Sequence, residues 1–227
     1  MLNQKTHETH LRRLLTLLFS NRTLAQSLCF KGGTALFMFY HLDRFSTDLD
    51  FNCTRLDLDV ERINDVFKDY TIQDYSNKYN TWFWLLSYQK THMKIKVEVS
   101  KRDFPDTYET KDLLGIPVNV MTKDCMFAHK LCAITDRKKL QNRDLYDAYF
   151  MLKNSFEIKE EIIQIRTKKN LKEYLQYLLE FIPKHVKPGY ILDGLGEVLD
   201  EKQKIWVKEN LIKMLIVEIQ NKILELN

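Results

Sequence analysis

The 227-residue sequence has no apolar run long enough to span a bilayer, no internal repeat and no low-complexity segment. The first thirteen residues are unlike a secretory signal, because charged or polar side chains interrupt them: Lys5, His7, Glu8, Arg12 and Arg13. We therefore expect a cytoplasmic protein that has no membrane partner.

Cysteine is scarce, and its spacing disfavours a fold stabilised by disulfides or by zinc. The four cysteines form no CxxC pair and no zinc-like pattern with histidine. They stand among apolar residues, which is typical of reduced cysteines in a core. These cysteines are Cys29, Cys53, Cys125 and Cys132.

The charge balance is only mildly basic. Lysine and arginine total 35 against 31 acidic residues, a net charge of +4 that permits a nucleic-acid partner without indicating one. Hydrophobic residues make up 44% and charged residues 29%, so the chain can bury an ordinary core, in one large domain or two small ones. Two basic clusters comprise Arg137, Lys138, Lys139, Arg166, Lys168 and Lys169.

Hydrophobic periodicity predicts an α/β half followed by a helical half, with domains over residues 1–120 and 121–227. Strands are expected at 28–30, 48–53, 82–88 and 93–99, the last two joined by a tight connection at 89–92. Helices are expected at 9–19, 34–40, 60–70, 123–134, 142–152, 171–181 and 198–226. Residues 101–119 contain Pro105, Gly115 and Pro117 and are expected to be irregular, while Pro183 and Pro188-Gly189 should interrupt the last two helices.

A glycine pair, Gly32-Gly33, lies where a short predicted strand runs into a buried helix. Amides at a helix N-terminus are unpaired and carry the positive end of the helix dipole, so they can bind phosphate. Thr34 adds a hydroxyl donor. Most glycine pairs are only turns, however, and Lys31 is more typical of a solvated strand end than of a phosphate contact.

Two aspartates follow on a predicted strand. Side chains alternate along a strand, so Asp48 and Asp50 should project to one face while Leu49 and Phe51 face a core. Neighbouring carboxylates repel each other unless a cation lies between them. Mg²⁺ bound to a nucleoside triphosphate would supply that cation, because it is commonly held by one or two carboxylates plus phosphates.

Three further polar residues have both a structural and a functional interpretation. Arg44 could neutralise the two aspartates, and Ser46 could cap a turn or reach toward phosphate. Glu98 lies on the polar face of its strand beside Lys94 and Lys96, and a cross-strand ion pair is the favoured interpretation. The alternative is a third carboxylate that holds a metal or accepts a proton.

Charged residues recur at helical spacing further along the chain. Lys130 and Arg137 are seven residues apart, Arg143 and Asp147 are four apart, and Asp144 and Asp147 are three apart. Salt-bridged faces of this kind are common in structural helices, so the spacing alone leaves the role of these residues open.

Four segments, in this order and spacing, resemble the AbiEii/AbiGii-type toxin nucleotidyltransferases of the DNA polymerase β-like superfamily. The segments are KGGTAL at 31–36, RFSTDLDF at 44–51, KIKVEVS at 94–100 and AHKLCAITDRKKLQNRDLYDAYF at 128–150. The resemblance covers roughly residues 25–152 and is far more specific than any single motif.

The resemblance implies an α/β (α+β) fold, in which a mixed-sheet nucleotidyltransferase core is followed by a helical part. It implies a metal site for Mg²⁺ or Mn²⁺ at Asp48, Asp50 and Glu98, which with Lys130 would be the catalytic residues. Nucleotide contacts or support would come from Gly32, Gly33, Thr34, Arg44, Ser46, Arg143, Asp144 and Asp147.

The expected activity is that of a toxin from a bacterial toxin–antitoxin or phage-defence pair. It would transfer a nucleotide from a nucleoside triphosphate to an acceptor hydroxyl, with the 3′ end of tRNA as acceptor and an antitoxin encoded nearby. The basic clusters would face the RNA. Two alternatives stay open: a small-molecule or protein acceptor, and a non-catalytic interaction protein.

Overall fold

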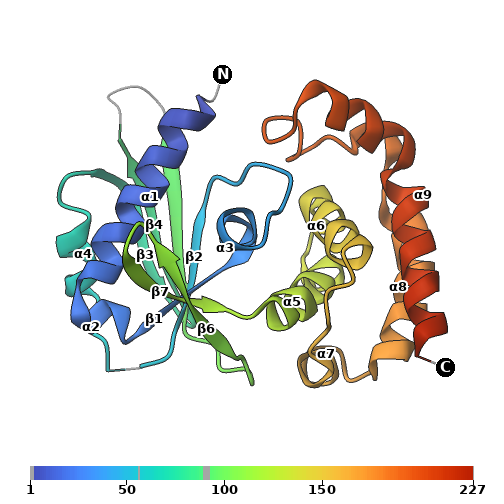
Figure 1. Cartoon of the computed structure of the whole chain (residues 1–227), viewed down its shortest axis with the longest axis horizontal. Helices are drawn as coiled ribbons and strands as arrows, with labels where there is room; N and C mark the ends of the chain where they lie inside the picture. The colour runs from blue at the N-terminus through green and yellow to red at the C-terminus, as the bar shows by residue number, and fades with distance from the viewer. Residues whose placement is uncertain (1–2, 56, 89–92, 227) are drawn as a thin grey trace. The chain divides into compact units, whose positions relative to one another are not determined.

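The computed structural model describes residues 3–55, 57–88 and 93–226 (Figure 1). Its contacts divide the chain into two compact units. Unit 1 comprises Met1–His41 and Phe45–Thr122, and unit 2 comprises Leu42–Arg44 and Lys123–Asn227. Three residues before the strand predicted at 48–53, Leu42–Arg44, thus belong to unit 2, and the rest of unit 2 begins at Lys123.

Unit 1 is built on a mixed sheet whose described residues form seven strands in the order β3-β4-β5-β2-β1-β7-β6. Strand β2 pairs antiparallel with β1 and parallel with β5. The strands are β1 (Leu28–Lys31), β2 (Leu49–Cys53), β3 (Thr71–Lys78), β4 (Thr81–Ser87), β5 (Lys94–Ser100), β6 (Tyr108–Leu113) and β7 (Ile116–Met121). This sheet confirms the predicted mixed-sheet α/β core.

The helices of unit 1 within the described residues are α1 (Gln4–Ser20), α2 (Arg22–Ala25), α3 (Gly32–Phe39) and α4 (Glu61–Val66). In Figure 1, α1 lies along the sheet. Its Phe19 ring packs against Phe51 of β2, with ring centroids 6.3 Å apart. Leu49 and Phe51 are both fully buried, whereas Asp50 between them is half-buried. The predicted alternation is therefore confirmed over 49–51, while Asp48 precedes the strand instead of lying in it.

The sequence prediction of unit 1 was wrong at three places, one of which is the short helix α2, which was not predicted. Residues 101–119 are not irregular throughout, because β6 and β7 form a hairpin there. Its two turn residues, Leu114 and Gly115, have φ values of 56° and 84°, as a type I′ turn requires. Strand β3 was also missed, because most of its side chains are exposed and lack an apolar face. The connection expected at 89–92 lies outside the described residues.

Unit 2 is helical over its described residues. It contains α5 (Lys123–Asp136), α6 (Asn142–Lys153), α7 (Glu160–Thr167), α8 (Leu171–His185), the 3₁₀ turn η1 (Pro188–Tyr190) and α9 (Glu201–Glu225). The short helix α7 was not predicted, and Pro183 lies inside α8 rather than interrupting it. Helix α9 packs on α6, where Tyr149 and Trp206 stack with centroids 4.9 Å apart. No described helix is long and apolar enough to cross a membrane.

Candidate nucleotidyl-transfer site

The glycine turn of unit 1 begins helix α3. Gly32 has a φ of 82°, a left-handed conformation that favours glycine. A Cβ atom at this position would overlap the Asp50 carboxylate, so the absence of a side chain leaves room for the acid beside the turn. Lys31 at the N-cap makes no side-chain capping hydrogen bond. The geometry thus brings an acidic side chain next to a helix N-terminus of the kind that binds phosphate.

Thr34 and Ser46 are buried and bonded to each other. The Thr34 hydroxyl lies 2.9 Å from the Ser46 Oγ, and it donates to the backbone carbonyl of Asp48. Both hydroxyls therefore hold the segment that leads into β2. The capping or phosphate-binding role of Ser46 stays a prediction, since its bond is to a side chain twelve residues away.

The two aspartates are both half-buried; Asp50 alternates with the buried Leu49 and Phe51 on β2, and Asp48 directly precedes the strand. In the sheet register, Asp50 stands between Lys31 of β1 and Glu98 of β5. Asp50 and Glu98 are thus direct neighbours on adjacent parallel strands.

Glu98 pairs with Lys96 of its own strand at 3.0 Å, an ion pair within β5 rather than the cross-strand pair that the sequence favoured. Within residues 3–55, 57–88 and 93–226, no three His, Cys, Asp or Glu side chains lie close enough together to hold a metal ion. Asp48 and Asp50 still fit Mg²⁺, which needs only one or two carboxylates when triphosphate oxygens complete its ligands. The three-carboxylate set with Glu98 stays a prediction.

A buried ionic network (Arg44, Lys130, Arg137, Asp144 and Asp147) forms the second candidate region, inside unit 2. Arg44 donates from Nε and Nη2 to the two Asp147 oxygens at 2.6 and 2.7 Å, a bidentate pair in which both side chains are buried. Lys130 adds a second contact to Asp147 at 2.7 Å. Burial would raise the pKa of Asp147, but Arg44 and Lys130 outweigh it and lower that pKa to about 2.

Asp144 is the second acid of the network and is also fully buried. Lys130 approaches it at 3.2 Å and Arg137 at 2.8 Å, so the two cations that stand seven residues apart meet at one carboxylate. The neighbouring Arg143 is half-buried on α6.

The network shows what two residues with open structural alternatives bond to inside unit 2. Arg44 bonds Asp147 through Nε and Nη2, and its role in neutralising the aspartate pair stays a prediction. Asp147 is bonded to Arg44 and Lys130, and its helical pair with Arg143 stays a prediction.

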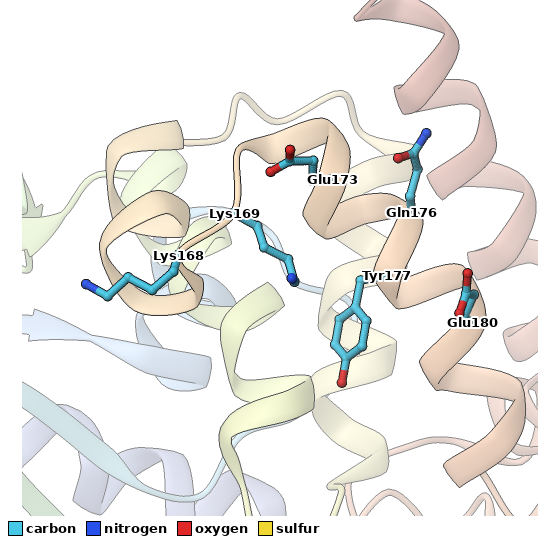
Figure 2. A pocket seen from close by; sticks show the side chains of 6 residues that line it. All are labelled: Lys168, Lys169, Glu173, Gln176, Tyr177 and Glu180. Carbon is cyan, nitrogen blue, oxygen red and sulfur yellow. The ribbon is translucent and has the colours of Figure 1, made fainter.

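Unit 2 also has a surface pocket of about 430 Å³ where α7 meets α8 (Figure 2). Its lining carries both signs of charge: Lys168, Lys169, Glu173, Gln176, Tyr177 and Glu180. Lys169 extends toward the Tyr177 ring, with Nζ 5.7 Å from the ring centroid. Arg166 of the same basic cluster is bonded to Asp136 and His129. The pocket is therefore not a uniformly basic surface.

One residue near the aspartates was not singled out from the sequence. His7 of α1 is buried, and it bonds the backbone carbonyl of Thr47 directly before Asp48. The available signal was its position on the apolar stripe of α1, four residues before Leu11 and eight before Leu15.

A mixed sheet with a pair of aspartates beside a glycine turn at a helix N-terminus is the arrangement of a nucleotidyltransferase core. Two crystal structures from Helicobacter pylori share the fold. One is described as a proposed nucleotidyltransferase: it is 24% identical in sequence, has a TM-score of 0.62, and the match covers 100% of this chain and 99% of that protein. The protein JHP933 is 20% identical with a TM-score of 0.58 and covers 100% and 97%.

The sequence family described as nucleotidyl transferase AbiEii toxin, type IV TA system, matches residues 13–209, and the chain belongs to this family. The predicted family resemblance is thereby confirmed, and the chain is a nucleotidyltransferase of a toxin–antitoxin type. Among proteins with curated descriptions, none is detectably similar to it.

Proposed function

We propose that the chain transfers a nucleotidyl group from a nucleoside triphosphate to an acceptor hydroxyl, with Mg²⁺ held by Asp48 and Asp50. The observation that carries this proposal is the Asp50 carboxylate lying over Gly32, at the N-terminus of α3. A helix N-terminus attracts phosphate oxygens, and an adjacent carboxylate attracts the cation that accompanies them.

The residues of unit 1 have separate roles in this proposal. The amides at Gly32 and Gly33 bind triphosphate oxygens, and Thr34 with Ser46 holds the backbone that presents Asp48. Held by Asp48 and Asp50, Mg²⁺ would supply positive charge to balance that of the triphosphate and of the pyrophosphate leaving group. Glu98, in register beside Asp50, accepts the proton of the attacking hydroxyl.

The ionic network of unit 2 has a supporting role in this proposal. Arg44 and Asp147 are too buried to contact a nucleotide without losing their bidentate pair. Lys130 is bonded to two carboxylates, so we assign it to holding α5 against α6. Within the segment at 128–150, we assign nucleotide binding to Arg143.

For the acceptor we propose the 3′-terminal hydroxyl of tRNA. Support comes from membership of a toxin family of the type IV class and from the basic residues near the ends of α5 and α7. The same membership supports a cognate antitoxin as partner. Transfer to the tRNA end would block aminoacylation, which accounts for toxicity.

The test incubates the purified chain with each labelled nucleoside triphosphate, Mg²⁺ and total tRNA. We expect label on the RNA, and its loss by at least a hundredfold in Asp48→Ala and Asp50→Ala, because each removes a proposed metal ligand. Asp57→Ala is the matched control, since Asp57 is an exposed acid of the same unit paired only locally with Arg55.

Each other outcome has a defined meaning. Label on protein or on a small molecule would replace tRNA as the acceptor while keeping the transfer chemistry. Full activity in Asp48→Ala would show that the metal is held elsewhere. A folded chain that neither labels any acceptor nor binds a triphosphate with Mg²⁺ in calorimetry would be an interaction protein instead.

A further inference from the structure

We propose that His7 is a positioning residue for Asp48, acting through the backbone carbonyl of Thr47. This inference rests on the proposed function, because it takes Asp48 to be a metal ligand. His7 lies on α1, before the first residue of the family match at residue 13, and far in sequence from every motif of the site.

The bonding of His7 fixes its ring orientation. Only 1% of His7 is exposed. Its Nε2 lies 2.9 Å from the Thr47 carbonyl oxygen, and its Nδ1 lies 2.9 Å from the Tyr88 hydroxyl. A carbonyl oxygen can only accept, so Nε2 carries the hydrogen, and in the neutral ring Nδ1 accepts from Tyr88.

Tyr88 is itself held in place. The ring of His10, one turn further along α1, stacks on it with centroids 4.0 Å apart and an interplanar angle of 26°. His7 meets the same tyrosine edge-on at 5.6 Å. The imidazole of His7 is therefore fixed at both nitrogens and cannot turn away from Thr47 without breaking a bond.

The consequence falls on Asp48. Two consecutive carbonyls of the segment that enters β2 are bonded from different directions: Thr47 by His7, and Asp48 by the Thr34 hydroxyl. The Thr47 hydroxyl also lies 3.3 Å from the Asp48 Oδ1. A carboxylate on a backbone fixed in this way loses less conformational entropy when it binds a cation. Asp50 is inside the strand, where the sheet ladder already fixes it.

The proposal predicts weaker metal binding when the Thr47 bond is lost. His7→Phe keeps a ring of similar size but cannot donate, and we expect its affinity for Mn²⁺ alone to fall at least tenfold, the usual effect of losing a group that orients a metal ligand. Free Mn²⁺ is counted by electron paramagnetic resonance, independently of activity. In the transfer assay kcat should fall in parallel, with the KM for the triphosphate changed less than threefold, because the glycine turn is untouched.

Conservative replacement separates positioning from packing. His7→Gln carries an amide that can donate to Thr47, so it should recover most of the lost Mn²⁺ affinity. His10→Phe is the matched control, since it alters the same helix and the same contact with Tyr88 but has no link to Thr47. Thermal unfolding of the metal-free variants reports the fold. Should His7→Phe not fold, Tyr88→Phe removes only the hydroxyl that bonds Nδ1 and should weaken Mn²⁺ binding in the same direction.

The outcomes separate this inference from the proposed function. Wild-type Mn²⁺ affinity in folded His7→Phe, or in Tyr88→Phe where His7→Phe does not fold, would overturn the positioning role. An equal loss in His10→Phe would overturn it as well, because general packing of α1 would then be the cause. If Asp48→Asn binds Mn²⁺ as tightly as the wild type, it is the proposed metal site that fails.

Discussion

At the scale of single residues, Gly32 joins backbone conformation to the chemistry of the site. Gly32→Ala should cost about 1–2 kcal/mol through the left-handed backbone and should also displace the Asp50 carboxylate. We expect transfer activity to fall at least tenfold beyond any loss of folded protein. Urea unfolding and the labelled-nucleotide assay measure the two effects separately.

The chain supplies a matched control for this substitution. Gly115 has nearly the same φ, 84° against 82°, but a Cβ there would meet nothing within 4 Å. Gly115→Ala should therefore show the conformational cost alone and keep full activity per folded molecule. Equal activity in the two variants would mean that the contact between Gly32 and Asp50 has no role in transfer.

Asp147 makes acid stability a second residue-scale prediction. The pKa of Asp147 is about 2 in the folded state and near 4 in the unfolded chain. The ionised carboxylate therefore stabilises the folded state above pH 4, and this contribution is lost as the pH falls toward about 2. Asp147 should account for about 2 kcal/mol of the unfolding free energy lost over that range. Asp147→Asn cannot titrate, so its unfolding free energy, measured in urea from pH 5 downward, should fall less steeply.

The same substitution should also lower stability at neutral pH by about 3–5 kcal/mol, because it leaves the buried Arg44 and Lys130 without their carboxylate. Asp136→Asn is the comparison, since its pair with Arg166 has 43% of the aspartate side chain exposed and should contribute less than about 1 kcal/mol. Parallel pH curves for wild type and Asp147→Asn would contradict the assigned pKa.

The predictability of the site depends on how local each contact is. Alternation along β2 placed Asp50 on the face opposite Leu49 and Phe51, because that rule needs only adjacent residues, whereas Asp48 lies just before the strand. The partner of Arg44 is 103 residues away, so no spacing rule could identify it. His7 likewise meets Thr47 through the packing of α1 on the sheet.

At the scale of elements, the β6–β7 hairpin has a turn residue poorly suited to its backbone. Leu114 has a φ of 56° and is 77% exposed, so its left-handed backbone is strained while its side chain gains nothing from burial. Leu114→Asn creates the Asn-Gly pair that type I′ turns prefer, and it should raise the unfolding free energy by about 0.5–1 kcal/mol. Thermal and urea unfolding measure the gain.

Leu114→Ala tests the cause of that gain. It removes the exposed apolar side chain but keeps the left-handed strain, so it should leave stability within about 0.5 kcal/mol of the wild type. A gain as large as that of Leu114→Asn would mean that surface hydrophobicity, rather than turn conformation, is the liability.

Elements with a strong apolar face were predictable, and those without one were not. The stripe of leucines in α1 and the alternation in β5 both reflect burial on one side. Strand β3 is exposed along most of its length and lies at the edge of the sheet, paired with β4. Its hydrogen-bonding partner rather than its side chains therefore makes it a strand. Gly115 looked like a breaker, yet it is the turn residue that lets β6 and β7 pair.

At the scale of the whole molecule, the two compact units do not follow the order of the sequence at one short segment. The contacts divide the chain at Thr122/Lys123, two residues beyond the boundary expected from the sequence, and they assign Leu42–Arg44 to unit 2. Arg44 belongs there through its bidentate pair with Asp147, and Asp43 through its bond from the Tyr146 hydroxyl at 2.9 Å. These three residues should therefore share the stability of α6.

Hydrogen exchange can test this division directly. In Asp147→Asn the amides of α6 and those within 42–44 should exchange faster together, because both depend on the same buried ionic network. The amides of β4 and β5, in the sheet of unit 1, should keep wild-type protection. Asp136→Asn should change neither group. If residues 42–44 keep their protection while α6 loses it, the segment is stabilised by its neighbours in sequence, and the Arg44–Asp147 pair does not tie it to unit 2.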